Sequence, residues 1–199
     1  KLEIVTSGPL TNTSLGAGGI YIWSMDGTLK KQILRIDYGS YQASMSSIDS
    51  SPALADLDNN KDLEIIFSTG RNKIVAFNHD GSMVQGWPKT MEGSVYVIGG
   101  DTEPSNSIAA DIDGDGSPDI IKSSGYAVTA NYSKLYAWNK NGVLIPGWPK
   151  TIGLAPNSIN IIYSTATAGD LDGDGLIEVF VAGKDGKLYG WMQGQFDER

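Results

Sequence analysis

The sequence contains no cysteine, so neither disulfide bonds nor thiolate chemistry can contribute to this chain. Its single histidine, His79, lies beside an Asp-Gly turn and has no second histidine or cysteine with which to form a metal site. We expect His79 to be a solvated turn residue. Because it is the sole candidate base, no Ser-His-Asp arrangement is supported, and Glu92 and Glu103 make an unconvincing acid and base pair. The chain is therefore expected to be non-catalytic.

Long apolar runs and an excess of positive charge are also missing. No apolar run approaches the ~18 residues that a membrane-spanning helix needs, and the first residues look like the inside of a folded unit rather than a signal peptide. The net charge of −8 argues against nucleic acid or an anionic membrane as a partner. Eleven of the 23 Asp and Glu residues fall at ligand-type positions of three short segments, where something positive is expected to offset their repulsion.

The three acidic segments belong to a repeat that covers nearly the whole chain. They align as SPALADLDNNKDLEIIFSTG (51–70), NSIAADIDGDGSPDIIKSSG (106–125) and TATAGDLDGDGLIEVFVAG (165–183). The first acids of these segments are 55 and 59 residues apart: Asp56, Asp111 and Asp170. A second apolar run follows each segment after a polar turn. This run aligns four aromatic residues in one column: Trp23, Phe77, Trp138 and Trp191.

Each complete copy is predicted to contain four antiparallel strands. Val, Ile, Phe, Tyr and Trp dominate the apolar runs, and Asp-Gly or Asn-Gly pairs mark turns at residues 26–27, 80–81 and 141–142. The run that enters each acidic loop is short and rich in alanine, which suits an innermost strand where neighbouring sheets converge. A four-stranded unit of about 40–60 residues describes a β-propeller blade. The predicted fold class is all-β, built from such blades.

The motif DIDGDGSPDI at residues 111–120, with its flanking strands, resembles the FG-GAP and VCBS repeats. These repeats form the blades of the integrin α-subunit propeller and occur in many secreted bacterial proteins. The resemblance is specific at the acidic loops and weaker in the linkers at residues 91–105 and 151–164. It implies a larger propeller of about seven blades, calcium-binding loops, and a role in cell adhesion or ligand binding.

The loop pattern D-x-D-x-D-G-x-x-D/E has a chemical reason. Calcium takes six to eight oxygen ligands at about 2.3–2.6 Å. A curled nine-residue loop can point side chains 1, 3, 5 and 9 inward and supply the backbone carbonyl of residue 7, while glycine at position 6 permits the sharp turn. The sequence therefore predicts three calcium sites. Their expected side-chain ligands are Asp56, Asp58, Asn60 and Glu64; Asp111, Asp113, Asp115 and Asp119; and Asp170, Asp172, Asp174 and Glu178. The expected carbonyl donors are Asp62, Ser117 and Leu176.

The first loop departs from the family pattern, because Lys61 replaces the glycine and Asn60 replaces an acid. We expect it to be the weakest of the three sites. Magnesium fits all three loops less well than calcium, since it accepts fewer protein oxygens and keeps its waters. The alternative is that the loops are acidic turns without an ion, because Asp and Gly are common turn residues. Three copies in register favour the ion.

An EF-hand shares the first nine loop positions but is excluded by the twelfth. Phe67, Lys122 and Val181 stand where that motif needs a bidentate Glu. The residues after each loop are also apolar at strand spacing rather than helical spacing. The loops therefore belong between strands.

Two Trp-Pro pairs, at residues 87–88 and 148–149, allow two interpretations. The favoured one is packing between blades beside the outer strand, where proline is tolerated at a sheet edge. The other is that the tryptophans are stacking platforms for sugars.

The copies divide the chain into four parts of one propeller fragment. We expect a partial blade at residues 1–50, blades with calcium loops at 51–105 and 106–164, and a partial blade with a calcium loop at 165–199. Glu3 aligns with Glu64, so the first copy lacks its inner strand, and the last copy stops before a full outer strand. The remaining blades are expected on the same chain or on a second chain.

These observations favour a non-catalytic, calcium-stabilised module of a secreted or cell-surface protein that binds protein or glycan ligands. Loops that need calcium near millimolar levels suit an extracellular setting. Two alternatives remain: an accessory domain of a secreted peptidase or polysaccharide-degrading enzyme, and a propeller lectin. The fold alone does not identify the ligand.

Overall fold

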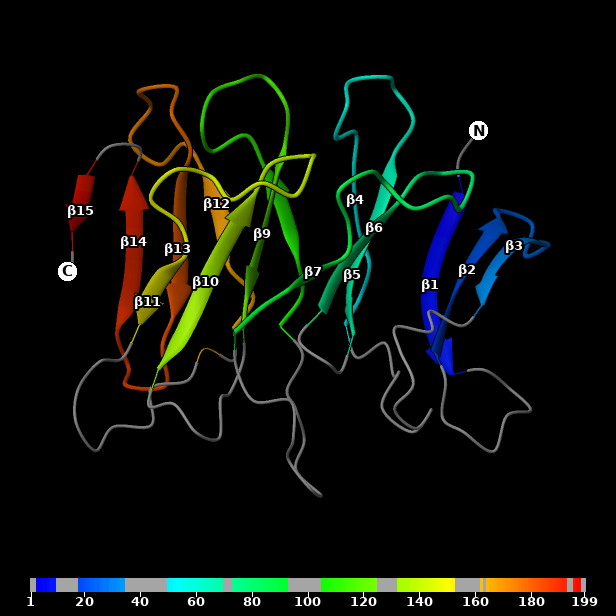
Figure 1. Cartoon of the computed structure of the whole chain (residues 1–199), viewed down its shortest axis with the longest axis horizontal. Coiled ribbons are helices and arrows are strands. Elements are labelled where there is room, and N and C mark those ends of the chain that lie inside the picture. The colour runs from blue at the N-terminus through cyan, green and yellow to red at the C-terminus, as the bar shows by residue number, and fades with distance from the viewer. Residues whose placement is uncertain are drawn as a thin grey trace.

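Four antiparallel sheets follow one another along the chain in a computed structural model (Figure 1). The structure describes residues 3–9, 18–34, 50–69, 73–92, 105–124, 132–152, 162, 164–192 and 195–197. These residues form strands and turns and contain no helix, which confirms the all-β prediction. The described part of the chain accordingly has no helix that is long and apolar enough to cross a membrane.

Each sheet is a meander in which consecutive strands pair. The first contains β1 (Glu3–Pro9), β2 (Gly18–Ser24) and β3 (Leu29–Leu34). The second contains β4 (Ala53–Ala55), β5 (Glu64–Thr69), β6 (Lys73–Phe77) and β7 (Lys89–Thr90). The third contains β8 (Ile108–Ala110), β9 (Asp119–Ser123), β10 (Ser133–Trp138) and β11 (Lys150–Ile152). The fourth contains β12 (Thr167–Gly169), β13 (Glu178–Ala182), β14 (Leu188–Met192) and β15 (Gln195–Asp197).

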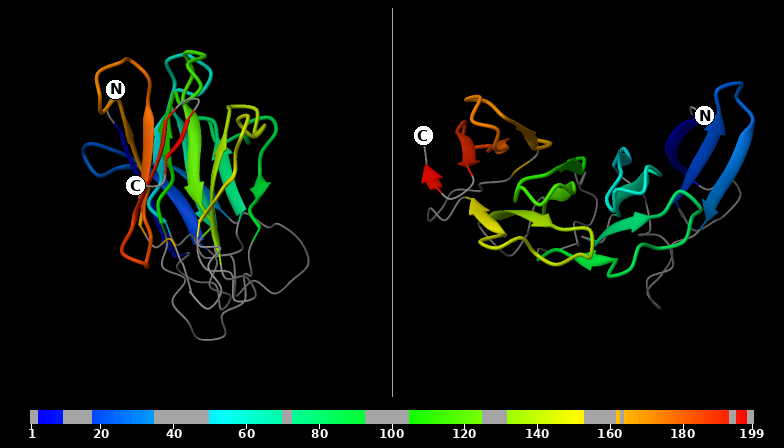
Figure 2. Two further views of the ribbon diagram at one scale, coloured as in Figure 1. Left: turned by 90° about the vertical axis from the view of Figure 1, so that its left-hand side faces the viewer. Right: turned by 90° about the horizontal axis from the view of Figure 1, so that it is seen from above.

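The sheets stand side by side along an open arc when the molecule is seen from above (right panel of Figure 2). The short strands β4, β8 and β12 lie on the inner side of this arc, where β4 contacts β8 and β8 contacts β12. Their alanine-rich sequences allow this approach, because small side chains leave room where sheets converge. The predicted innermost strand is thus confirmed.

Strand register confirms the alignment of the repeats. In every sheet the aromatic column residue pairs with the residue that directly follows the ninth loop position. The four pairs are Ile4 with Trp23, Ile65 with Phe77, Ile120 with Trp138, and Val179 with Trp191. A slip of one residue would turn all of these side chains to the opposite face, so the shared register fixes which residues lie between sheets.

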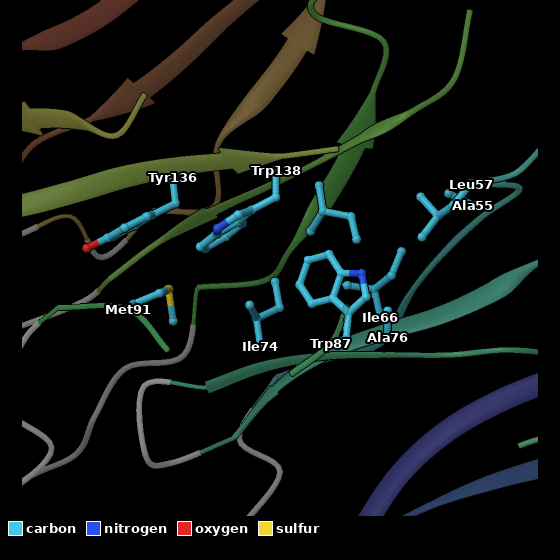
Figure 3. Close-up of a cluster of buried hydrophobic side chains, with 10 residues drawn as sticks. Ala55, Leu57, Ile66, Ile74, Ala76, Trp87, Met91, Tyr136 and Trp138 are labelled. Atoms are coloured by element: carbon cyan, nitrogen blue, oxygen red, sulfur yellow. The ribbon is translucent and has the colours of Figure 1, made fainter. Parts of the chain in front are cut away.

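Apolar side chains fill the space between the second and third sheets (Figure 3). Ile66, Ile74 and Ala76 of the second sheet pack with Tyr136 and Trp138 of the third. A second cluster joins the third and fourth sheets, and a third joins the first and second. Each sheet is therefore stabilised mainly by its neighbours, as the blades of a propeller are.

Trp87 seals the interface between the second and third sheets. Only 6% of its surface is exposed, and its Nε1–H donates to the carbonyl of Lys140 at 2.9 Å. Its ring meets that of Trp138 edge-on, with 6.0 Å between centroids. One sheet further on, Trp148 contacts Trp191 with 5.9 Å between ring centroids and the ring planes tilted by 55°. The predicted packing role is confirmed for Trp87, whereas Trp148 is only half-buried against the fourth sheet. Each Trp-Pro pair precedes its outer strand.

Hydrogen bonds that could not be predicted from the sequence also join the inner edges of the sheets. The backbone N–H of Ser51 donates to Oδ1 of Asn106 at 2.9 Å, and the N–H of Asn106 donates to Oγ1 of Thr165 at 3.0 Å. The three residues occupy one aligned position of the repeat. Each backbone donor is satisfied by a side chain of the following sheet, which fixes the spacing of the sheets at the inner side of the arc.

Two sequence expectations need comment. The fourth sheet has a short outer strand, β15, in which Phe196 pairs with Trp191, where the sequence predicts that the chain stops before a full outer strand. The linkers at 91–105 and 151–164 lie largely outside the described residues, as does Glu103. The first sheet has three strands, as the missing inner strand of that copy predicts.

We predict that Trp87→Ala lowers the free energy of unfolding by about 3–5 kcal/mol, because it removes a buried indole and its hydrogen bond. Urea denaturation of the whole chain measures this change. Trp23→Ala is the matched control, since Trp23 occupies the aromatic column of the first sheet but is only half-buried, and it should cost much less. Equal losses in the two variants would contradict the sealing role of Trp87.

Candidate metal centre

The acidic loops lie at the same edge of the array, at the top of Figure 1. Each joins an inner strand to the next strand of its sheet: β4 to β5, β8 to β9, and β12 to β13. The first acid directly follows the inner strand, and the ninth loop residue is the first residue of the next strand. The antiparallel pairing of the two strands therefore brings the first and ninth positions together.

The leading aspartate closes each loop through backbone hydrogen bonds. Asp111 accepts from the N–H groups of Gly114 at 2.8 Å and Gly116 at 2.9 Å. Asp170 accepts in the same way from Gly173 at 2.7 Å and Gly175 at 3.0 Å. This carboxylate curls the chain around itself, which explains why an acid begins every loop.

The first loop closes differently. Asp56 accepts from the N–H groups of Asn60 and Lys61, both at 2.9 Å, so its first bond comes from loop position 5 rather than position 4. The departure from the family pattern thus changes the hydrogen bonding without opening the loop.

Side chains at positions 3 and 5 turn the rest of the loop. In the second loop, Asp113 accepts from the N–H of Asp115 at 3.1 Å, and Asp115 accepts from the N–H of Ser117 at 2.7 Å. The equivalent bonds in the other loops run from Asp62 to Asn60 at 2.7 Å and from Leu176 to Asp174 at 2.8 Å. These local turns direct successive acids toward the centre of the loop.

Three acids gather in every loop, with one oxygen atom from each lying within 4.8 Å of the others. The groups are Asp56, Asp58 and Glu64; Asp111, Asp113 and Asp115; and Asp170, Asp172 and Glu178. Asp119 and Asp174, which the sequence also assigns as ligands, lie outside these groups but remain in the same loops. The carbonyl-donor role of Asp62, Ser117 and Leu176 stays a prediction.

The ninth residues are buried carboxyls. Glu64, Asp119 and Glu178 are each about 1% exposed. One oxygen of each accepts the backbone N–H of loop position 2, from Leu57 at 2.8 Å, Ile112 at 3.0 Å and Leu171 at 2.6 Å, in that order. The other oxygen of Glu64, Oε1, is buried without a hydrogen-bond partner.

A buried acceptor without a partner costs about 1–3 kcal/mol of folding free energy. A cation bound beside Glu64 Oε1 would remove this cost. Carboxylate oxygens are the ligands that hard divalent cations prefer. The residues of the loops therefore fit a metal ion of this kind.

Burial also changes the acidity of two ninth residues. It is the main reason that the pKa of Asp119 is raised to about 7, and the neighbouring charges of Asp113, Asp115 and Asp111 contribute in the same direction. The pKa of Glu64 is raised for the same main reason, with smaller effects of Asp58 and Asp56. A cation in the loop would act in the opposite sense by favouring the ionised form.

Left-handed backbone occurs at two positions of each loop. Gly114 and Gly116 have φ of 77° and 88°, and Asn59 and Lys61 of the first loop have φ of 60° and 77°. The loop motif predicts left-handed backbone at position 6, but it does not predict it at position 4. The signal available at position 4 was its residue types, since Asn59, Gly114 and Gly173 all tolerate positive φ. Lys61 therefore adopts a conformation that is costly for a residue with a Cβ.

The first loop also contacts the second. The side-chain amide of Asn59 donates to the carbonyl of Gly116 at 3.2 Å and to Oγ of Ser117 at 3.1 Å. His79, as expected, is an exposed turn residue. Its Nδ1 lies 3.6 Å from a carboxylate oxygen of Asp62, which is also exposed, and the two form a surface pair.

The match to known families centres on these loops. Residues 56–121 match the FG-GAP-like repeat family, from the first acid of the first loop to the third residue of β9. The matched segment covers a third of the chain and is similar to an FG-GAP-like repeat from the first acidic loop through β5, β6, β7 and β8 to the start of β9. No curated protein matches the sequence.

Two solved structures are similar to this chain. The C-terminal domain of Pseudomonas aeruginosa PilY1 superposes with a TM-score of 0.63 at 13% identity, covering 94% of this chain and 38% of that domain. BamB from Moraxella catarrhalis gives a TM-score of 0.49 at 14% identity, covering 98% of this chain and 65% of BamB. The chain thus spans less than two thirds of either protein. The similarity to PilY1 shows the fold, and the sheets of this chain are β-propeller blades.

We predict that the metal-free protein loses stability as the pH rises from about 4 to 7. An unfolded aspartate ionises near pH 3.8, whereas folded Asp119 holds its proton up to about pH 7. The stabilisation is therefore complete below the unfolded pKa and is lost as the pH rises through the folded one. Melting temperatures in chelator between pH 4.5 and 7.5 measure the slope.

Asp119→Asn should reduce that slope, because the amide does not titrate. Asp80→Asn is the matched control: Asp80 lies in an exposed turn, and bonds to Ser82 lower its pKa. Any contribution of Asp80 is lost only at more acidic pH, so the slope in this window should be kept. A slope that Asp119→Asn leaves unchanged would contradict the assignment.

We also predict that Lys61→Gly raises the free energy of unfolding by about 0.5–1 kcal/mol. Relief of the left-handed strain is worth about 1–2 kcal/mol, and the greater freedom of glycine in the unfolded chain offsets part of it. Chemical denaturation measures the change. Lys184→Gly is the control, since Lys184 lies in a turn without positive φ and should gain nothing. Equal effects would show that the strain at Lys61 is negligible.

Proposed function

We propose that this chain is a non-catalytic propeller module of a secreted or cell-surface protein, in which calcium bound at the three acidic loops stabilises the blades. The module would present loops for binding a protein or glycan. The observation that carries this proposal is the repeated carboxylate cluster, which recurs at the same junction of three successive sheets with a buried acid at its ninth position.

The chemistry of the loops supports calcium over other cations. A set of three or four carboxylates with a backbone carbonyl approaches the six to eight oxygens that calcium takes, whereas magnesium keeps several waters. With so many protein ligands, little coordination remains for a substrate, which favours a structural role. Calcium near millimolar concentration is available outside cells, and this supports the extracellular assignment.

Calcium would act by holding each inner strand to its neighbour. The ion would sit where β4 meets β5, β8 meets β9 and β12 meets β13, and it would offset the repulsion among the acids there. Because Asn59 contacts Gly116 and Ser117, order in the first loop would also support the second. The ion would thereby stabilise the array as well as the separate hairpins.

Further protein parts would cover the outer sheets. Leu171 and Leu188 of the fourth copy are 75% and 57% exposed, and Ile4 and Leu29 of the first sheet are 45% and 42% exposed. Blades of the same or a second chain would bury these side chains. The similarity to a longer domain, of which this chain spans 38%, is consistent with additional blades.

The lectin alternative receives less support at one of its two candidate platforms. Trp87 is buried and its indole N–H is bonded to Lys140, so its ring has no face to offer a sugar. An accessory role beside a secreted enzyme would use the same calcium-stabilised scaffold. A catalytic domain encoded next to this chain would favour that role, and calcium-dependent capture of a protein ligand would favour adhesion.

We predict that chelation lowers the melting temperature and that calcium restores it. Each occupied site should contribute about 1.5–3 kcal/mol when free calcium is ten to a hundred times Kd. Asp58→Asn, Asp113→Asn and Asp172→Asn alter the third position of each loop while keeping an acceptor for the local turn. Each should reduce the calcium-dependent gain and leave the chelated protein as stable or more so.

Asp80→Asn is again the control, since Asp80 carries the same charge outside the loops and should leave the calcium response unchanged. Calorimetric titration with calcium and with magnesium separates the two cations. A melting curve that does not respond to exhaustive chelation would refute the metal role.

A further inference from the structure

The first and second acidic loops touch through the side chain of Asn59. This residue holds position 4 of the first loop, and its amide donates to the carbonyl of Gly116 at 3.2 Å and to Oγ of Ser117 at 3.1 Å. An amide group has two protons to donate, so the two bonds can form together. The contact cannot recur between the second and third loops, because position 4 of the second loop is Gly114, which has no side chain.

The contact reaches the part of the second loop that is expected to supply a backbone ligand. Ser117, the predicted carbonyl donor, is 8% exposed, whereas its equivalent in the third loop, Leu176, is 39% exposed. The peptide group between Gly116 and Ser117 is held on both sides: its carbonyl accepts from Asn59, and its N–H donates to Asp115 at 2.7 Å. Asn59 therefore fixes the orientation of the backbone that leads to the Ser117 carbonyl.

The conformation of Asn59 depends in turn on the acids of the first loop. Its own backbone is left-handed, with φ of 60°. The N–H of the next residue, Asn60, donates to Asp56 at 2.9 Å and to Asp58 at 3.2 Å. Both acids belong to the carboxylate cluster of that loop, together with Glu64. An ion that draws these carboxylates together would therefore also fix Asn59.

A separate observation points to a ligand in the first loop. Glu64 is only 1% exposed, and its Oε1 is buried without a hydrogen-bond partner. Such an oxygen is costly unless a donor or a cation meets it, and carboxylate oxygens are the ligands that calcium takes. This oxygen, together with the acid cluster, indicates a cation site in the first loop.

We propose that Asn59 is a positioning residue for the metal site of the second loop, and that calcium bound in the first loop raises the affinity of the second loop for calcium. With the contact made, the Ser117 carbonyl is already oriented. With the contact broken, the ion itself must order this backbone, which weakens binding. Coupling between two sites is reciprocal, so the first loop gains affinity by the same factor. This inference rests on the proposed function, since it requires that the loops bind calcium.

Charge repulsion between loops is the competing cause of any coupling. A cation in one loop would relieve the repulsion felt by its neighbours, and this effect would reach the second loop from both the first and the third. It fades in 1 M salt, where the Debye length is about 3 Å. Coupling through the hydrogen bonds of Asn59 should persist in that salt and be confined to the first and second loops.

The test is a calcium titration of the whole chain in 1 M KCl, followed through the backbone N–H signals of Lys61, Gly116 and Gly175 in NMR spectra. Each residue holds position 6 of its loop and donates to the leading aspartate, so each signal reports the affinity of its own loop. Asp58→Asn should weaken binding in the first loop and, about fivefold, in the second, and it should leave the third unchanged. Asp172→Asn is the matched control and should weaken only the third loop.

Asn59→Gly should by itself weaken the second loop about fivefold, because it removes both hydrogen bonds while glycine still permits the left-handed backbone. In this background Asp58→Asn should no longer affect the second loop. Ser117→Ala, which removes one acceptor and keeps the backbone carbonyl, should give a smaller loss in the same loop. Unchanged binding at Gly175 verifies that each variant is folded.

The outcomes separate this inference from the proposed function. If all three signals respond to calcium but Asp58→Asn and Asn59→Gly leave the affinity of the second loop unchanged, the coupling is overturned and the calcium role stands. Equal losses at Gly116 and Gly175 in Asn59→Gly would show a general loss of stability and would also overturn the positioning role. If no signal responds to about 10 mM calcium, which exceeds the range of extracellular calcium modules, the proposed function fails and this inference fails with it.

Discussion

Repulsion between clustered carboxylates is the constraint on which this array depends. Every sheet from the second onward begins with a short inner strand that runs directly into an acidic loop. The loop can close because its first aspartate accepts backbone N–H groups, but this closure places several negative charges within a few ångströms of one another. The same geometry that shapes the hairpin therefore creates a demand for positive charge at each junction.

Neighbouring sheets are held together by a few specific contacts in addition to the loops. At the loop edge, Asn59 connects the first loop to the second. At the outer side, Trp87 closes the second interface and is bonded to the next sheet. Apolar side chains fill the space between, so that no sheet buries both of its faces alone. Stability in such an array is shared between neighbours rather than stored in one core.

Much of this arrangement could be predicted from the sequence, because a repeat presents the same signal several times. The aromatic column, the alanine-rich inner strands and the acid spacing each recur in register, and register in a sheet leaves little freedom. The link from Ser51 through Asn106 to Thr165 could not be predicted, since three different polar side chains occupy that position. The left-handed backbone at position 4 was concealed because Asn59 stands for glycine in one copy.

The inner-edge hydrogen bonds give the arc a direction. Each bond runs from a backbone N–H of one sheet to a side-chain oxygen of the sheet that follows. The two ends of this row of bonds therefore present different hydrogen-bonding groups. Thr165 places a main-chain donor at one flank, and Ser51 places a side-chain acceptor at the other. A further blade would therefore have to join head-to-tail, as in a heterologous assembly, because a blade added in the reverse sense would set donor against donor or acceptor against acceptor.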